Sequence, residues 1–284
     1  MRAILGIDAA WTPAEPSGLA LVAKRLTGWH LVAVATSYQR FLSLADHSLI
    51  AQERPLGSLP EASALLAAAS MLCGRAVDLI AVDVPLAHSH VRGRRFSDNA
   101  VSKAYGGRKC GTHSPTALRP GAISDALNRD FARAGYLLQT EAITIPGLIE
   151  VYPHPGLVEL MGASERLPYK ALKVRRYWPS ITPEERRARL YEQWDKIITS
   201  LEGEIVGVAA ALPKLELDAS GVHVKAYEDA LDAVVCAWVG VCALEGRAAP
   251  FGNEDSAIWI PRPRVTVATA YDPLASDHLA SPAE

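Results

Sequence analysis

Short apolar runs separated by Pro, Gly and Thr open the chain, a spacing that is typical of strands joined by tight turns. These runs cover residues 3–8, 18–24 and 29–36 and predict a three-stranded meander. Two later runs, 78–85 and 147–153, are mostly apolar, carry a carboxylate and end at a proline. Strands that are apolar on both sides are buried on both faces. The pattern therefore favours a sheet that is covered by helices.

Helical patterns lie between and after these runs. Residues 61–73 are strong helix formers and stop at Gly74, a common helix terminator. Residues 182–185, Thr-Pro-Glu-Glu, form a capping box with proline at the first helical position, and apolar residues then recur at helical spacing. The other predicted elements are helices over 124–138 and 225–244, a small closing strand at 259–261 and a loose tail over 271–284.

Composition describes an ordinary globular protein. The chain has 284 residues, 49% apolar content and a formal net charge of -2, which provides no overall attraction to nucleic acid. Its four cysteines are widely separated and form no C-x-x-C pair, which suits a reducing compartment. Because no export signal or run of roughly 18 apolar residues is present, we expect a cytoplasmic protein without a membrane span.

Basic residues are concentrated in residues 88–119, where seven Lys or Arg stand against one acid, Asp98. We expect a basic loop region here, and the glycines beside Arg108 and Lys109 suggest a loop that closes over a substrate. A second basic cluster occupies 170–176. Both segments suit either phosphate contacts or a solvated surface. The candidate substrate-binding residues are Arg94, Arg95, Arg108 and Lys109.

Carboxylates supply the main chemical signal. Asp8, Asp83 and Glu150 each end or interrupt an apolar strand, and Asp229 and Asp232 share one face of the last predicted helix. Clustered, partly buried carboxylates repel one another unless a cation compensates, and hard cations such as Mg²⁺ or Mn²⁺ prefer oxygen ligands. Taken singly, an acid at such a position is more often a turn former or a helix cap than a metal ligand. Together they predict a shared metal site.

Competing chemistries leave weaker traces. The chain has no phosphate-binding G-x-x-x-x-G-K-[ST] loop, no G-x-G-x-x-G after the first strand, no G-x-S-x-G elbow and no H-E-x-x-H motif. His88, His90, Cys110 and His113 could be imagined as a zinc site, but their spacing matches no standard zinc motif. His154 follows the strand that carries Glu150 and could be structural or assist catalysis there.

With these residues placed, the chain resembles the family of predicted ribonuclease H-like nucleases, the domain of unknown function numbered four-two-nine. The resemblance covers nearly the whole chain and depends on the order and spacing of its motifs. They are Gly6-Ile7-Asp8 with Trp11, Ala81-Val82-Asp83-Val84-Pro85, Glu150-Val151-Tyr152-Pro153, Tyr169-Lys170, Asp229-Ala230-Leu231-Asp232 with Cys236-Ala237, and Ile258-Trp259-Ile260-Pro261. The chain departs from the family's R-x-C-D pattern, because Ser97 stands where the family often has cysteine.

The resemblance implies an α/β fold with a ribonuclease H-like mixed sheet of five strands, the first three antiparallel, and helices on both faces. We expect one domain over residues 1–270, with helical or loop insertions at about 88–145 and 160–215. The family's metal ligands would be Asp8, Asp83 and Asp232, with Asp229 beside them, whereas Glu150 and Lys170 match positions of unassigned role. The candidate catalytic residues are Asp8, Asp83, Glu150, Lys170, Asp229 and Asp232.

These features predict a nuclease or related phosphodiester hydrolase that depends on Mg²⁺ or Mn²⁺ and contacts the backbone of DNA or RNA. Two alternatives stay open. One is an ATP-binding or phosphotransfer protein of the actin-like type, which would need two duplicated lobes. The other is a catalytically inactive protein that binds nucleic acid.

Overall fold

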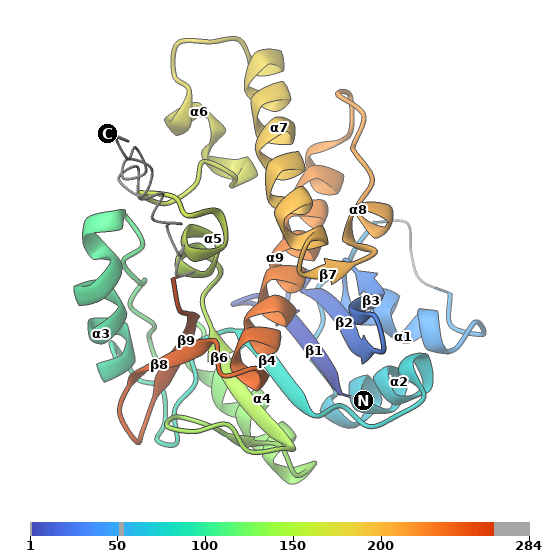
Figure 1. Cartoon of the computed structure of the whole chain (residues 1–284), viewed down its shortest axis with the longest axis vertical. Helices are drawn as coiled ribbons and strands as arrows, with labels where there is room; N and C mark the ends of the chain where they lie inside the picture. Colours follow the sequence, from blue (N-terminus) through green and yellow to red (C-terminus); the bar gives the residue numbers. More distant parts are fainter. Residues whose placement is uncertain (1, 51–53, 264–284) are drawn as a thin grey trace, which may run out of the picture.

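The computed structural model describes residues 2–50 and 54–263 of the chain. A single twisted sheet lies at the centre of these residues, with helices around it (Figure 1). The predicted tail over 271–284 lies outside the described residues.

The sheet begins with the predicted meander. β1 (Ala3–Asp8), β2 (Gly18–Arg25) and β3 (Gly28–Ala35) pair antiparallel in that order, as expected. β4 (Leu79–Asp83), β6 (Gly147–Val151) and β9 (Ala257–Pro261) then extend the sheet in parallel from β1. The first strands are thus antiparallel and the centre is parallel, which confirms a mixed sheet.

Nine strands are present in the described residues, and the expectation of five was wrong. The three strands that the hydrophobic runs did not predict lie mainly at the margins. β7 (Ile205–Val206) pairs with β3, β5 (Leu137–Leu138) pairs with β6, and β8 (Ala248–Gly252) pairs antiparallel with β9. Two of these strands have only two residues, so no periodic pattern in the sequence could reveal them.

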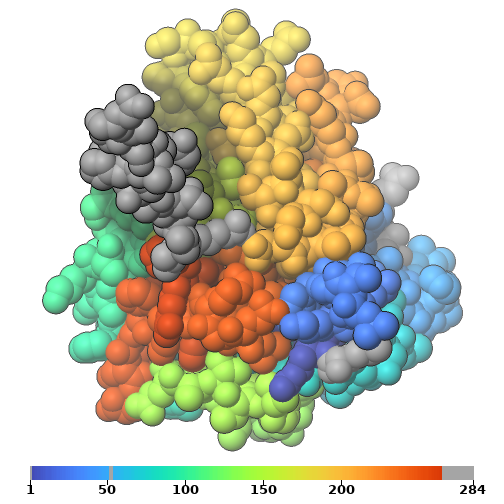
Figure 2. All heavy atoms as spheres, in the orientation of Figure 1, coloured from blue at the N-terminus to red at the C-terminus, as the bar shows by residue number. Residues whose placement is uncertain are grey.

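Helices cover both faces of the sheet, as predicted. Successive residues of β1 point to opposite faces of the sheet. Ile4 belongs to the core formed with α5, α7 and α9, whereas Leu5 belongs to the core formed with α1, α2 and α4. Figure 1 shows α9 crossing in front of β1, and in Figure 2 the side chains of α7 and of the segment around α9 and β8 cover much of this side. The helices are α1 (Tyr38–Ala45), α2 (Ala62–Cys73), α3 (Phe96–Tyr105), α4 (Gly121–Arg133), α5 (Pro153–Met161), α6 (Val174–Tyr177), α7 (Pro183–Glu202), α8 (Val208–Ala211) and α9 (Gly221–Leu244).

The expectation of a loop over 88–119 was wrong for its middle part, where α3 and a 3-10 turn at Gly106–Arg108 form. Arg95 is the N-cap of α3, and the Asp98 carboxylate accepts its backbone N–H at 2.8 Å. Arginine is not a usual N-cap residue, so the helix start was hidden in the sequence. The predicted helix over 124–138 begins earlier and ends at Arg133, because Gly135, at φ 90°, turns the chain into β5.

α9 packs directly against β1 and β2 at glycines. A Cβ atom on Gly6 would lie 2.3 Å from the Ala233 carbonyl oxygen, and one on Gly18 would lie 2.0 Å from the Asp229 carbonyl oxygen. Such distances are far below van der Waals contact, so backbone meets backbone here. This contact determines how closely the carboxylates of α9 approach the ends of the strands.

We expect Gly6→Ala to reduce the free energy of unfolding by about 1–3 kcal/mol or more, because the added methyl group overpacks the contact between β1 and α9. Urea unfolding followed by circular dichroism would measure the change. Gly93→Ala is the matched control, since a Cβ there has nothing within 4 Å. Equal midpoints for the two variants would contradict the tight contact.

Candidate functional site

Two carboxylates lie side by side at one edge of the sheet. β1 and β4 run parallel in register, with Asp8 opposite Asp83, and each aspartate is the last residue of its strand. Glu150 on β6 is the register partner of Val82, so its backbone lies one step before this edge. Parallel pairing therefore brings together residues that are 75 positions apart in the sequence, as the sequence predicted.

α9 brings a second group of carboxylates to the same place. Glu228, Asp229 and Asp232 are at most 4% exposed. The Tyr169 hydroxyl donates a hydrogen bond to Asp232 at 2.9 Å, and the Lys170 ammonium forms an ion pair with Asp232. Lys170, Tyr169 and the helix thus enclose Asp232 completely.

Two lysines hold the remaining acids of this cluster. The Lys170 Nζ lies 3.3 Å from Glu228 Oε1, and the backbone N–H of Ala171 donates to Glu228 Oε2 at 2.5 Å. Lys225, one turn before Asp229 on α9, forms an ion pair with it. We call five acids the carboxylate cluster: Asp8, Asp83, Glu228, Asp229 and Asp232. The ammonium groups of Lys170 and Lys225 form ion pairs with the three acids of α9.

Burial is the main influence on the pKa values of the aspartates in the cluster, and neighbouring carboxylates add to it at Asp8 and Asp83. Burial and the nearby Asp229 carboxylate raise the pKa of Asp8 to about 7, and burial raises the pKa of Asp229 and of Asp232 to about 6. Burial and the charge of Asp8 also raise the pKa of Asp83 well above its ordinary value. Although burial opposes its charge, the Asp232 carboxylate holds the pKa of Lys170 well above the usual range. The five acids of the cluster outnumber the two lysine ammonium groups that pair with them.

Two cavities open beside the cluster. One, of about 750 Å³, is lined by residues that include Asp8, Asp83 and Asp229. The other, of about 290 Å³, is lined by residues that include Asp83 and Glu150. Trp11, Asp83, His113, Lys170, Leu172 and Lys225 line both. The cavities are thus neighbours. Asp8, Asp83, Glu228 and Asp229 of the cluster line one or both of them, whereas the enclosed Asp232 lines neither.

Three cationic side chains face these cavities with their charged ends free. Arg119 lines the larger cavity, and Arg166 and Lys173 line the smaller one. Within residues 2–50 and 54–263, no hydrogen bond or ion pair engages the side-chain nitrogens of these three residues. They can therefore contact an anionic substrate.

The four candidate substrate-binding residues have partners within the chain instead. Arg94 donates to Asn99 at 2.7 Å and to Ser102 at 2.6 Å, Arg108 pairs with Glu159 at 2.5 Å, and Lys109 pairs with Glu165 at 2.6 Å. Neither Arg94, Arg108 nor Lys109 lines the cavities beside the cluster. Lys109 follows the 3-10 turn in a left-handed conformation with φ 59°.

Arg95 lies at the centre of a buried ion network. Its guanidinium donates to both oxygens of Glu150, at 2.5 and 2.8 Å, and also to Asp98 and to the Leu86 carbonyl oxygen. The Leu86 N–H also donates to Glu150 at 2.7 Å. Burial raises the pKa of Glu150 to about 7, against the effect of Arg95. Glu150 and Arg95 thus anchor the segment after β4, and this role could not be read from the sequence.

A hard divalent cation fits the donor chemistry of the cluster, because all of its acidic side chains present carboxylate oxygens. In the described part of the chain, however, no group of three His, Cys, Asp or Glu side chains is arranged to hold a metal ion. This holds for the cluster and for His88, His90, Cys110 and His113, the imagined zinc ligands. His90 pairs with Asp125, and Cys110 is buried. An ion bound at Asp232 would compete with Lys170.

Glu228 and Lys225 are the site residues that the sequence analysis missed. Both precede the recognised aspartates by four residues, Lys225 before Asp229 and Glu228 before Asp232. Residues four apart lie on the same helix face. Their positions one helical turn before each aspartate are the sequence signal that points to them.

Together, the fold and the site define a mixed α/β protein with a carboxylate cluster where two parallel strands end against a long buried helix. The family described as "Protein of unknown function (DUF429)" matches residues 6–257, and the chain belongs to this family. This confirms the domain of unknown function that the sequence motifs suggested. Neither the comparison with curated proteins nor that with solved structures found a match. Among the described helices, none has the length and apolar character needed to cross a membrane.

The raised pKa of Asp8 predicts a pH-dependent stability. Between pH 3.8, the ordinary pKa of an aspartate, and about pH 7, Asp8 holds a proton in the folded protein that it releases in the unfolded chain. The stabilisation that this proton provides therefore falls across the range and is lost as pH rises through about 7. Asp8→Asn removes this pH dependence. Without divalent metal, the free energy of unfolding of the variant relative to that of the parent should therefore rise by on the order of 2 kcal/mol between pH 5 and pH 8.

Urea titrations at several pH values in the presence of a chelator would measure this difference. Asp218→Asn, at an exposed position, is the control and should show no such trend. A difference between Asp8→Asn and the parent that stays constant with pH would contradict the burial of an electrostatically strained Asp8.

Proposed function

We propose that the protein hydrolyses phosphodiester bonds of nucleic acid with the help of a divalent metal ion. The observation that supports this most is the register pairing of Asp8 with Asp83 at the ends of two parallel strands, facing the buried acids of α9. The cluster gathers more negative than positive charge and opens to cavities with free cationic groups. A cation and a polyanion together would balance this distribution.

Asp8, Asp83 and Asp232 would hold the metal ion, with Mg²⁺ or Mn²⁺ as the natural choice. When bound, the ion would supply an activated water and stabilise the leaving oxygen. Asp229 adds negative charge beside Asp8, and Tyr169 orients Asp232 through its hydrogen bond. Lys170 pairs with Asp232 and therefore makes metal binding depend on the release of that ion pair.

Substrate would be held by the free cationic side chains beside the cavities. Arg119, Arg166 and Lys173 would neutralise phosphates on either side of the cluster, which needs no reading of base sequence. Trp11 lines both cavities and offers an aromatic surface on which a base can stack. This arrangement favours an unpaired strand that passes over Asp83.

One observation favours a second candidate, a nucleic-acid-binding protein without catalytic activity. Lys170 and Lys225 form ion pairs with Asp232 and Asp229, and so partly neutralise the cluster without a metal ion. Such a protein would bind nucleic acid in a salt-dependent manner without metal. The ATP-binding alternative requires two lobes, whereas the described residues build a single sheet.

Cleavage of labelled single-stranded and duplex DNA and RNA with Mn²⁺ or Mg²⁺ would test the proposal. We expect cleavage by the parent protein and a loss of about a hundred-fold or more in Asp8→Asn, because loss of a ligand should cost at least as much as loss of its supporting contacts. Asp218→Asn should keep full activity. Equal cleavage by Asp8→Asn and the parent, or metal-independent binding without cleavage, would overturn the proposal.

A metal-binding measurement would test the ligand set separately from activity. We expect Lys170→Gln to bind Mn²⁺ about ten-fold or more tightly than the parent, because removing a nearby positive charge favours a cation. Isothermal titration calorimetry would measure this, with Lys214→Gln as the control, since the exposed Lys214 pairs with the half-buried Asp195 away from the cluster. Unchanged or weaker Mn²⁺ binding in Lys170→Gln would argue against Asp232 as a ligand.

A further inference from the structure

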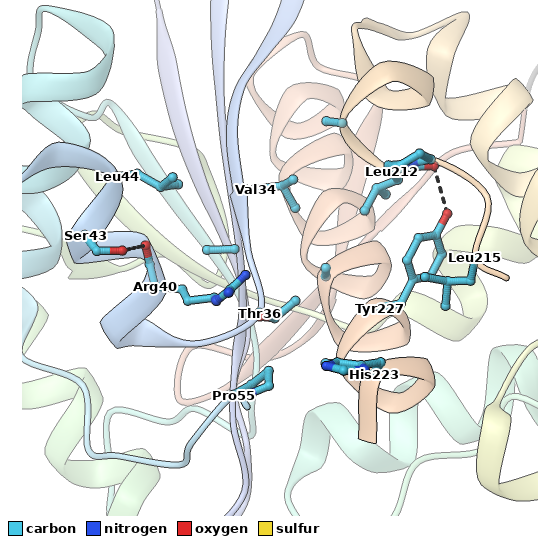
Figure 3. Close-up of a pocket in the computed structure, with 15 residues that line it drawn as sticks. Val34, Thr36, Arg40, Ser43, Leu44, Pro55, Leu212, Leu215, His223 and Tyr227 are labelled. Carbon is cyan, nitrogen blue, oxygen red and sulfur yellow. Dashed lines mark hydrogen bonds between the residues drawn. The ribbon is translucent and has the colours of Figure 1, made fainter. Parts of the chain in front are cut away.

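A third cavity, of about 740 Å³, lies away from the carboxylate cluster. Its walls come from the end of β3, from α1, from the segment around α8 and from the first turns of α9. It shares no lining residue with the two cavities beside the cluster. Figure 3 shows α1 on one side of it and α9 on the other. Its size is that of a cavity for a small organic ligand.

Most of the lining is apolar. Val34 and Leu44 contribute on the side of β3 and α1, and Leu212 and Leu215 on the side of α8 (Figure 3). Tyr227 adds its ring, and its hydroxyl is already used because it donates to the Leu212 carbonyl oxygen at 2.9 Å. These walls can bury the apolar body of a ligand but offer it few polar partners.

The other polar side chains of this cavity belong to Thr36, Arg40, Ser43 and His223. The Ser43 hydroxyl already donates to the Arg40 carbonyl oxygen at 2.9 Å. Arg40 reaches from α1 towards Thr36, and His223 lies on the facing turn of α9 (Figure 3). Within the described chain, no hydrogen bond or ion pair engages the Arg40 guanidinium, and His223 uses only Nδ1, which contacts Ser220 Oγ at 3.1 Å. Thr36 Oγ1 is buried without a hydrogen-bond partner.

Negative charge is missing from the same walls. Among the described residues, neither aspartate nor glutamate lines the cavity. A free guanidinium, a free imidazole nitrogen and an unsatisfied hydroxyl therefore surround an apolar space to which the described residues supply no counter-ion. The charge complement of such a space is an anion that carries an apolar body.

We propose that this cavity binds an amphipathic anion, with its carboxylate or phosphate group held by Arg40 and His223 and its apolar part against Leu212, Leu215 and Tyr227. Thr36 Oγ1 would donate its hydrogen bond to the same anionic group. The site is independent of the carboxylate cluster and of the hydrolysis proposed there.

Calorimetric titration of the full chain with decanoate, decyl phosphate and 1-decanol, each below its micelle concentration or solubility limit, would test the site. We expect saturable binding of at least one of the two anions and at least ten-fold weaker binding of the neutral alcohol. Tighter binding of decanoate or of decyl phosphate identifies the head group. In Arg40→Gln with His223→Gln, binding of the preferred anion should weaken about ten-fold or more, because charge-assisted hydrogen bonds are lost.

Two further variants separate the site from general effects of charge and folding. Arg25→Gln removes the same charge at an exposed residue that lines a different cavity, and should bind like the parent. Ala211→Trp fills the apolar part from an exposed position and should abolish binding while the thermal unfolding midpoint stays near that of the parent. The proposal is overturned if no anion binds, if 1-decanol binds equally well, or if the Arg40 and His223 variant binds like the parent.

Discussion

The direct contact between α9 and the first two strands is the constraint on which the site depends. Gly6 and Gly18 leave no side chain between the backbones, so the helix lies against the sheet where Asp8 and Asp83 end their strands. A wider spacing would place the acids of α9 farther from these two residues and let water between them. Burial raises the pKa values of Asp8, Asp229 and Asp232, and the mutual proximity of the carboxylates adds to the effect at Asp8 and Asp232.

Concentrated negative charge has an energetic cost that the protein offsets in two different ways. In the cluster, Lys170 and Lys225 supply ammonium groups, but the acids outnumber them. Around Glu150, Arg95 engages both carboxylate oxygens and Asp98, so that this second set of buried charges is hydrogen-bonded throughout. Buried charges that are fully paired anchor structure, whereas buried charges left in deficit are typical of sites that bind or react. By this criterion, Arg95 and Glu150 belong to the framework and the carboxylate cluster is the candidate site.

Three of the cavities in the described residues differ in the charge of their lining. The two beside the cluster combine acids with Arg119, Arg166 and Lys173, and so suit a polyanion together with a cation. The third combines Arg40 and His223 with apolar walls and contains no acid among its described lining residues. α9 borders both regions, since Lys225 and Asp229 face the cluster and His223 and Ala226 face the third cavity. One helix thus carries two chemically different surfaces, because residues three or four apart share a face and intermediate ones do not.

Local patterns in the sequence were sufficient for the main elements. Hydrophobic runs predicted β1 to β4 and β6, the capping box at Thr182 predicted α7, and acids at strand ends predicted that Asp8 and Asp83 would meet. These features depend on residues close together in the chain or on the regular pairing of strands.

Tertiary structure decided the rest. Arg95 meets Glu150 across 55 residues and Lys170 meets Asp232 across 62, and two-residue strands such as β5 and β7 exist only because a neighbouring strand pairs with them. Long basic side chains reach whichever carboxylate or carbonyl the fold brings near. Their sequence positions therefore could not show that Arg94, Arg95 and Arg108 have partners within the chain while Arg119 and Arg166 face the cavities.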